Sequence, residues 1–169
     1  MPTHAEHRLL PYTSEQLFDL VADVERYPIF LPWWAEARVW KREGDVYYTD
    51  QVIRFQIFRQ RFPSRTVLKH PEYIDVTSSG GPFRHLDMRW TFKPAPDGGC
   101  RVRLRVDFEV RSKFLGTLVG VVFVEVVRRI VAAFEERAHQ LYGSPPEASA
   151  GTRLASTAEK RAERRGHDT

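Results

Sequence analysis

The sequence predicts an α+β domain in which a curved antiparallel sheet of about seven strands surrounds one long C-terminal helix. Three observations lead to this prediction: a helical apolar stripe within 112–142, period-two alternation through most of 37–110, and helical signals just after the first strand. Right-handed twist curls a sheet of this length. A long amphipathic helix laid in the concave side would then complete two layers.

The long helix is predicted from Ser112 to Tyr142 because both ends carry clear signals. Ser112 is a good N-cap, and Gly143, followed by Ser144-Pro145-Pro146, is a stop. The apolar side chains recur at steps of three and four residues, as expected for a helix that covers a core. The predicted stripe consists of Leu115, Val119, Val122, Val126, Ile130, Ala133, Phe134, Ala138 and Leu141.

The front half of this helix is apolar on every side. From Phe114 to Val124 there is no charged residue, so Val121 and Phe123 fall outside the predicted stripe. The run is about half of the ~20 residues that cross a bilayer, which excludes a transmembrane helix. Two interpretations stay open: additional buried core, or a surface for lipid or a second chain, including a peripheral contact with a bacterial inner membrane.

Short helices are predicted directly after a first strand at His4–Leu10. Thr13 and Gln16 form a capping box that begins the first helix. In the following segment, 24–34, Pro28 and Pro32 forbid a long helix while large apolar side chains crowd together. We expect a helical kink or a short 3₁₀ turn here, at the rim of a cavity.

The remaining strands follow from alternation and turn signals. They are predicted at Arg38–Arg42, Val46–Phe58, Gln60–Lys69 and Tyr73–Ser78, and then along the alternations of 86–93 and 102–110. The inward residues identified in this way are apolar or aromatic almost without exception. A cavity between sheet and helix would therefore suit a lipid-like, ring-bearing molecule better than a charged one.

Composition sets wider bounds. The net charge of +4 permits anionic partners without demanding them. Arg101, Arg103 and Arg105 form a basic row, but Asp107 and Glu109 continue it, so a solvated sheet face is preferred over an anion-binding one. We expect no DNA partner.

Location and domain extent follow from cysteine usage and from the two ends of the sequence. The single cysteine, Cys100, lies in a predicted turn; it excludes an internal disulfide and indicates a reducing compartment. The first residues lack the apolar core of a signal peptide, which favours a cytoplasmic location. We expect one domain over 1–143 and a disordered tail over 144–169.

Motifs for metal, phosphate or nucleophilic chemistry are missing from the sequence. The histidines form no HxxxH pair or cysteine–histidine set, and there is no phosphate loop or GxSxG. His85 is a candidate general base, but it begins a strand at the rim of the sheet. We therefore predict a protein that binds and does not catalyse, with no cofactor or metal.

Three segments carry a family resemblance. They are VADVERYPIFLPW at 21–33, GPFRHL leading to WTF at 81–92, and AFEERA leading to LYG at 133–143. Together they resemble the coenzyme Q-binding START-like family, which includes the mitochondrial coenzyme Q10 proteins and bacterial RatA-type proteins within the polyketide cyclase/dehydrase and lipid transport group. The resemblance covers residues 3–143.

The resemblance implies a helix-grip (START/Bet v 1-like) fold whose cavity takes ubiquinone or a similar isoprenoid. The lipid would be delivered without chemical change, supporting respiratory electron transport or ubiquinone biosynthesis. The residues of the two matching motifs and the inward alternation define the predicted ligand-binding set. It consists of Tyr27, Pro28, Phe30, Leu31, Pro32, Trp33, Phe55, Gly81, Pro82, Phe83, Met88, Trp90, Phe108, Leu118 and Val122.

Two alternatives come from the same resemblance. RatA-type members are described as toxins that bind the large ribosomal subunit and block subunit association, and the basic sheet face would then be the contact. A polyketide cyclase or dehydratase is the enzymatic alternative. It would need polar groups converging inside the cavity, and the predicted inward residues supply almost none.

Overall fold

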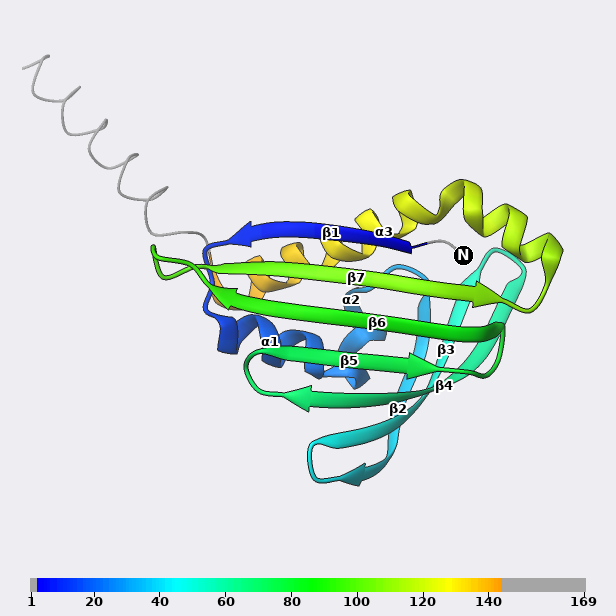
Figure 1. Ribbon diagram of the computed structural model, residues 1–169, viewed down its shortest axis with the longest axis horizontal. Coiled ribbons are helices and arrows are strands. Elements are labelled where there is room, and N and C mark those ends of the chain that lie inside the picture. The colour runs from blue at the N-terminus through cyan, green and yellow to red at the C-terminus, as the bar shows by residue number, and fades with distance from the viewer. Residues whose placement is uncertain (1–2, 144–169) are drawn as a thin grey trace, which may run out of the picture.

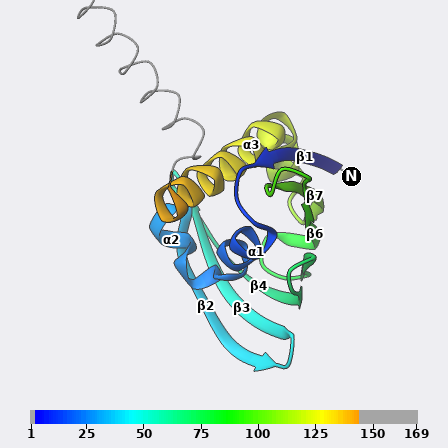
Figure 2. The same cartoon turned by 90° about the vertical axis from the view of Figure 1, so that its left-hand side faces the viewer.

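The structure is a computed structural model that describes residues 3–143. Met1, Pro2 and the predicted tail at 144–169 lie outside the described residues. A single antiparallel sheet curves around the C-terminal helix (Figures 1 and 2). The elements are β1 (Thr3–Leu10), α1 (Ser14–Ala22), η1 (Val24–Arg26), α2 (Tyr27–Phe30), β2 (Trp34–Glu43), β3 (Val46–Phe55), β4 (Phe58–Lys69), β5 (Tyr73–Ser78), β6 (Phe83–Pro94), β7 (Cys100–Val110) and α3 (Lys113–Tyr142).

The seven strands lie in the order β1-β7-β6-β5-β4-β3-β2, so the first two strands of the chain form the two edges. The short helices α1, η1 and α2 carry the chain from one edge to the other across the concave side (Figure 2). Register shifts between Trp34 and Glu36 and between Val39 and Lys41 mark bulges in β2. Such bulges increase the local bend of a strand, and β2 and β3 curl strongly at this edge.

Both predicted ends of the long helix are confirmed. The amide of Gly116 donates to the carbonyl of Ser112 at 2.8 Å, and the amide of Gly143 donates to the carbonyl of His139 at 2.9 Å. Gly143 has φ of 84°, a left-handed conformation that glycine adopts without steric cost. Within residues 3–143, no helix is both long enough and apolar enough to cross a membrane.

The buried face of α3 differs from the predicted stripe. Val122 is 41% exposed and Leu141 is 50% exposed. The prediction stepped back from Phe134 in fours, and each four-residue step turns about 40° around a helix axis. After three such steps the side chain no longer faces the core. The buried residues observed in α3 are instead spaced by a mixture of three and four, which keeps them on the core-facing side. Among the described side chains of α3, the buried ones are Phe123, Val127, Val131, Phe134 and Ala138. The side chains of Leu115 and Val119 in the predicted stripe lie outside the described residues.

The predicted single strand Val46–Phe58 is wrong, because it contains a hairpin. β3 ends at Phe55 and β4 begins at Phe58, with Gln56 at φ of 53° in the turn between them. β-branched and aromatic residues continue through this turn without glycine, proline or asparagine, so the local sequence carries no turn signal. Cys100 likewise begins β7 and is fully buried, whereas the sequence had placed it in a turn.

The short helices form as predicted. The Thr13 side chain accepts a hydrogen bond from the Gln16 amide at 3.1 Å, and the Gln16 side chain accepts one from the Thr13 amide at 3.0 Å. This reciprocal pair satisfies two amides at the start of α1. The proline segment then folds as the 3₁₀ helix η1 and the one-turn helix α2, which has Pro28 in its first turn.

An ion cluster around Glu6 joins β1 to α3. Glu6 is 9% exposed and accepts a hydrogen bond from Arg8 at 2.8 Å, while Arg128 Nε lies 3.4 Å from the same carboxylate. Arg8 Nε also lies 2.8 Å from Glu135 Oε1, an ion pair without hydrogen-bond geometry. Burial by itself raises the pKa of Glu6, but hydrogen bonds from His4 and Arg8 outweigh it and hold that pKa below 4.5.

Replacing this carboxylate should weaken the attachment of α3. We expect Glu6→Gln to lower the free energy of unfolding by about 1–3 kcal/mol at neutral pH, because Arg8 and Arg128 lose a buried ionised partner. Since the folded pKa of Glu6 is depressed, its contribution is present above the unfolded pKa and is lost as pH falls through the folded pKa. Urea unfolding at neutral pH and well below pH 4.5 measures both effects.

The matched control is Glu125→Gln, which removes an exposed pair with Arg129 on the same helix. Its expected change is below about 0.5 kcal/mol. Equal losses in the two variants would contradict a special role for the Glu6 cluster.

Candidate functional site

Phe134 of α3 is the centre of an aromatic group under the long helix. Its ring contacts Tyr27, Phe30 and Trp90 edge-on, with ring centroids 5.3, 5.4 and 5.1 Å away. Edge-to-face pairs of this kind add to the energy of area burial. The proline segment, the sheet and α3 are therefore tied together at one point.

The double-proline segment holds its side chains with little freedom. Leu31 is 5% exposed, and its amide donates to the carbonyl of Tyr27 at 2.8 Å. The Tyr27 hydroxyl donates to the carbonyl of Val21, and burial raises the pKa of Tyr27 well above its ordinary value. Pro28 and Pro32 are both half-buried. These contacts fix the geometry of the corner, as the sequence predicted.

The two tryptophans after Pro32 point to different places. Trp33 has φ of 67°, and its ring contacts Phe55 on the β3–β4 hairpin at 6.1 Å. Trp34 contacts Tyr27 and donates from its indole nitrogen to Gln51 at 2.8 Å. The left-handed backbone at Trp33 thus directs the Trp33 ring to the β3–β4 hairpin and the Trp34 ring to the interior.

A second aromatic series crosses the sheet to the front of α3. Phe83 contacts Phe62 at 5.4 Å and Phe108 at 6.4 Å, and Phe108 contacts Phe123 of α3 at 4.6 Å. The turn that positions Phe83 needs a glycine: Gly81 has φ of 60°, and a Cβ there would lie 2.2 Å from the carbonyl oxygen of Arg61. The Gly-Pro-Phe motif therefore docks this loop on β4.

A buried polar cluster lies on the inner side of β3 and β4. Gln51 donates to the hydroxyls of Thr49 and Ser64 at 3.0 and 3.1 Å, and these two hydroxyls are hydrogen-bonded to each other. Thr49, Gln51 and Ser64 are 0%, 5% and 4% exposed. Trp34 completes the cluster by donating to Gln51. The prediction of an interior with almost no polar groups is wrong for this half of the sheet.

The two hydroxyls of the cluster hold one hydrogen more than the bond between them uses. The Gln51 amide nitrogen donates toward both hydroxyl oxygens, and only one of the two hydroxyls donates to the other. The second hydroxyl hydrogen has no acceptor among residues 3–143. Buried donors normally have partners, so this hydroxyl suits a carbonyl or hydroxyl oxygen brought by a ligand.

Tyr47 and Cys100 are buried titratable groups with raised pKa values. Burial raises the pKa of Tyr47 to about 12, and its hydroxyl donates to the carbonyl of Ala22 at 2.9 Å. Burial also raises the pKa of the Cys100 thiol. His85 lies with Asp107 and Glu109, its ring nitrogens 3.3 and 3.8 Å from the two carboxylates. Because Phe108 between these acids points inward, His85 lies on the outer face, away from the cluster.

Two hollows are lined by described residues of the helices and the sheet. A cavity of about 20 Å³ lies between α1, α3 and β6, lined by residues that include Leu17, Trp90, Phe92, Val131 and Phe134. This is the size of a single water site. A cavity of this size does not hold a ring-bearing ligand. A larger surface groove of about 190 Å³, beside α1 and η1, has Asp19, Asp23 and Glu25 in its lining and does not suit an apolar guest.

The structure brings five of the predicted ligand-binding residues together in two groups. Tyr27, Phe30 and Trp90 meet at Phe134, and Phe83 and Phe108 lie in the second series. Met88 is half-buried against the core, Trp33 meets Phe55 at the rim, and Gly81 and Pro82 form the loop.

Two predicted residues of α3 do not belong to these groups in the described structure. Val122 is 41% exposed and takes part in none of these ring contacts, and the side chain of Leu118 lies outside the described residues. The sequence reasoning missed the residues that carry the polar cluster and two of the aromatic contacts. These are Trp34, Thr49, Gln51, Ser64, Phe123 and Phe134. Period-two alternation through Tyr47, Thr49 and Gln51 was the available signal.

Comparisons with known proteins agree with the fold and the resemblance. The profile of the family described as polyketide cyclase / dehydrase and lipid transport matches residues 10–135. The ribosome association toxin RatA of Pseudomonas aeruginosa is 35% identical over 144 residues, covering 85% of this chain and 100% of the relative. Coenzyme Q-binding protein COQ10 homolog B, mitochondrial, of Xenopus laevis is 33% identical over 144 residues, covering 83% of this chain and 59% of that protein.

A solved structure extends the comparison to the fold. The ZhuI aromatase/cyclase from Streptomyces sp. R1128 superposes with a TM-score of 0.76 at 12% identity, covering 86% of this chain and 98% of that one. At this identity the likeness concerns the fold alone. The predicted helix-grip fold and the predicted family resemblance are both confirmed.

Removing the central side chain of the polar cluster should lower the stability of the protein. We expect Gln51→Leu to lower the free energy of unfolding by about 1–3 kcal/mol, because the Trp34 indole and two hydroxyls lose a buried partner. Urea unfolding measures the change. The control is Gln60→Leu on β4, an exposed side chain without a hydrogen bond in the described residues, for which we expect less than about 0.5 kcal/mol. A Gln51→Leu variant as stable as the wild type would show that the cluster is not a stabilising network.

Proposed function

Because the chain belongs to the polyketide cyclase / dehydrase and lipid transport family, we propose that it binds and carries ubiquinone or a similar isoprenoid lipid between its sheet and α3. The observation that carries the proposal is the buried cluster of Thr49, Gln51 and Ser64 with its uncommitted hydroxyl hydrogen. A quinone has a carbonyl at one end and an apolar remainder. It would present an acceptor to this hydroxyl and hydrocarbon to the aromatic side chains around it.

The aromatic surroundings support the apolar part of such a ligand. Phe62, Phe83, Phe108 and Phe123 form a continuous series of ring contacts from β4 to the front of α3. Burial of apolar surface contributes roughly 25 cal/mol per Å², so an isoprenoid chain would bind through area without further polar contacts. The name of the Xenopus laevis relative, a coenzyme Q-binding protein, is consistent with this ligand class.

We further propose that the bound lipid leaves chemically unchanged. The polar groups of the cluster are two hydroxyls, an amide and an indole, which donate and accept hydrogen bonds but do not titrate near neutral pH. The nearest buried tyrosines, Tyr27 and Tyr47, have raised pKa values. General acid–base catalysis works best with a group whose pKa lies near the operating pH. This arrangement supports carriage over catalysis.

The first test measures the binding of a short-chain ubiquinone to the purified protein by tryptophan fluorescence. The second identifies lipid extracted from the purified protein by mass spectrometry. We expect saturable binding and a co-purified isoprenoid. Removing both hydroxyls in Thr49→Val/Ser64→Ala should weaken binding by roughly three- to tenfold, the effect of one neutral hydrogen bond.

The control is Ser78→Ala, which removes a buried hydroxyl that donates to the carbonyl of Pro63 outside the cluster. It should leave the affinity for the quinone unchanged. An empty protein that does not bind the quinone at saturating concentration overturns the proposal. Equal affinities for the double variant and the control overturn the role of the cluster.

A second candidate is association with the ribosome, favoured by a basic face on β6 and β7. This face consists of Lys93, Arg101, Arg103 and Arg105, all exposed and without ion pairs in the described residues. Lys93 lies directly opposite Arg101 in the strand register. Like charges in opposite positions destabilise a sheet, so a polyanionic partner would relieve a cost that the free protein bears. RatA of Pseudomonas aeruginosa is named a ribosome association toxin.

This candidate predicts a salt-dependent interaction. We expect the chain to co-sediment with ribosomal subunits at low salt and Arg101→Gln/Arg103→Gln/Arg105→Gln to reduce the slope of log affinity against log salt by about three. The control replaces Arg38 and Arg65, two exposed arginines elsewhere on the sheet, with glutamine. No co-sedimentation at low salt, or the same loss in both variants, would eliminate the basic face as the contact.

A further inference from the structure

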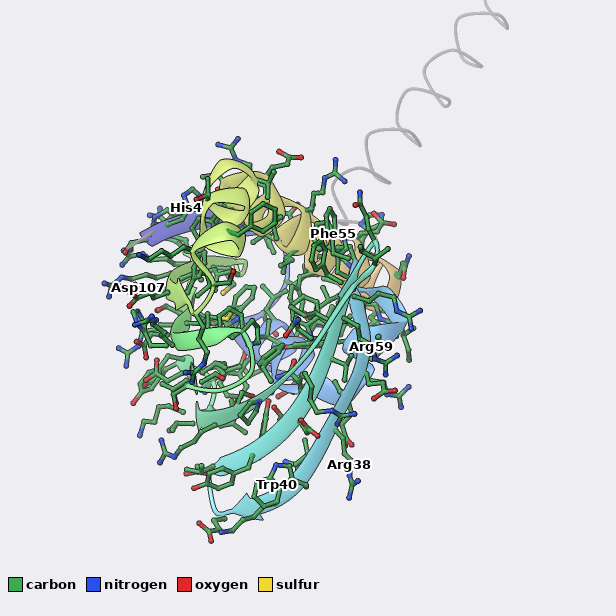
Figure 3. All side chains as sticks on the ribbon, turned by 90° about the vertical axis from the view of Figure 1, so that its right-hand side faces the viewer. His4, Arg38, Trp40, Phe55, Arg59 and Asp107 are labelled. Atoms are coloured by element: carbon green, nitrogen blue, oxygen red, sulfur yellow. The ribbon has the colours of Figure 1, made fainter. Side chains whose placement is uncertain are left out.

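The β3–β4 hairpin and the start of α3 lie at the same end of the molecule (Figures 1 and 3), and both carry exposed apolar side chains. Ile57, in the hairpin turn, is 91% exposed, and Phe114 in the first turn of α3 is 75% exposed. Phe55 and Phe58 on either side of the turn are 46% and 39% exposed. We call these four residues the apolar rim. These exposed side chains do not contribute to the hydrophobic core.

Backbone contacts hold the segments of this end together. The Arg54 amide donates to the carbonyl of Trp33 at 2.7 Å, which fixes the hairpin to the double-proline corner. The loop at 79–82 lies against β4, since a Cβ on Gly81 would meet the carbonyl of Arg61. The Arg111 amide donates to the carbonyl of Pro82 at 2.9 Å and so attaches the entry to α3. The apolar rim is thus carried by one connected end of the fold.

The charges on these segments are all of one sign. The ranges 54–62, 79–84 and 110–124 contain no aspartate or glutamate, and their charged residues are Arg54, Arg59, Arg61, Arg84, Arg111 and Lys113. Arg59 and Arg61 pair with Glu36, and Arg61 also pairs with Asp50, which offsets their charge. Arg54, Arg84 and Lys113 are exposed and form no ion pair within residues 3–143.

We propose that this end docks on the surface of an anionic lipid bilayer, with Ile57 and its neighbours entering the interface and the cations contacting lipid headgroups. Exposed apolar side chains interspersed with arginine and lysine have the composition of interfacial membrane contacts. A nucleic acid would meet the cations but offers no hydrocarbon to Ile57. A second copy docked through the same end would bring like charges together.

The apolar rim would give the proposed lipid carrier a membrane-binding site. This proposal does not depend on which molecule binds between the sheet and α3. The rim includes Phe55, which contacts Trp33 at the double-proline corner, and the front of α3 follows Phe114. A bilayer in contact with this end would therefore lie beside the double-proline corner and the front of α3.

The experiment is co-sedimentation of the full chain with vesicles of phosphatidylcholine alone and of phosphatidylcholine mixed with phosphatidylglycerol. We expect binding to the mixed vesicles, weakened by salt. Ile57→Asp should reduce this binding at least about tenfold, because it places a charge in the interface. Arg54→Gln/Lys113→Gln should reduce binding to the mixed vesicles about thirtyfold, at roughly 1 kcal/mol for each cation near the surface.

The matched control is Leu9→Asp, which makes a similar change at another exposed apolar side chain, 61% exposed, on β1. It keeps every residue of the rim and should bind as the wild type does. Circular dichroism melting confirms that each variant is folded. Absence of binding to mixed vesicles, or equal losses in Ile57→Asp and Leu9→Asp, overturns the proposal. So does a dimer in sedimentation velocity that Ile57→Asp disrupts in the absence of vesicle binding, since a second copy would then cover the rim.

Discussion

The structure depends on one constraint: α3 and the short helices together have to cover the concave face of a seven-stranded sheet. The back half of α3 meets this demand with Val127, Val131, Phe134 and Ala138, all buried. Phe134 contacts both the sheet, through Trp90, and the proline segment, through Tyr27 and Phe30. The Glu6 ion cluster adds a polar attachment to β1 at the same helix. The back half is thereby anchored to the sheet, to the proline segment and to β1.

The front half of α3 is attached differently. Phe123 is buried against Phe108, while Val122 and Val124 on neighbouring faces are 41% and 39% exposed. No charged residue occurs between Lys113 and Glu125, so this part of the helix has no ion pair to hold it in one orientation. A helix anchored at the back and apolar all round at the front can move away from the sheet without breaking a buried charge pair. In the proposed carrier function, this freedom would let a ligand enter beneath the helix.

The interior contains aromatic side chains and the polar cluster of Thr49, Gln51 and Ser64. Two other surfaces, one basic and one apolar, lie on different parts of the exterior. The basic face lies on β6 and β7, whereas the apolar rim lies on the β3–β4 hairpin and the start of α3. Because these surfaces use different residues, an interaction with a polyanion and an interaction with lipid can be altered independently. The family members named for ribosome association and for coenzyme Q binding share this one fold.

The sequence by itself determined the order of elements, both ends of α3, the capping box of Thr13 and Gln16, and the kinked proline segment. These features depend on signals a few residues long, such as caps, prolines and alternation. The rotation of α3 was decided by the tertiary structure, because an all-round apolar helix leaves its phase open until Phe123 and Val127 pack on the sheet. The hairpin at Gln56 was also decided by the fold, because the local sequence carries no turn signal. The cluster of Thr49, Gln51 and Ser64 needed the strand register, which brings Ser64 beside residues that are distant along the chain.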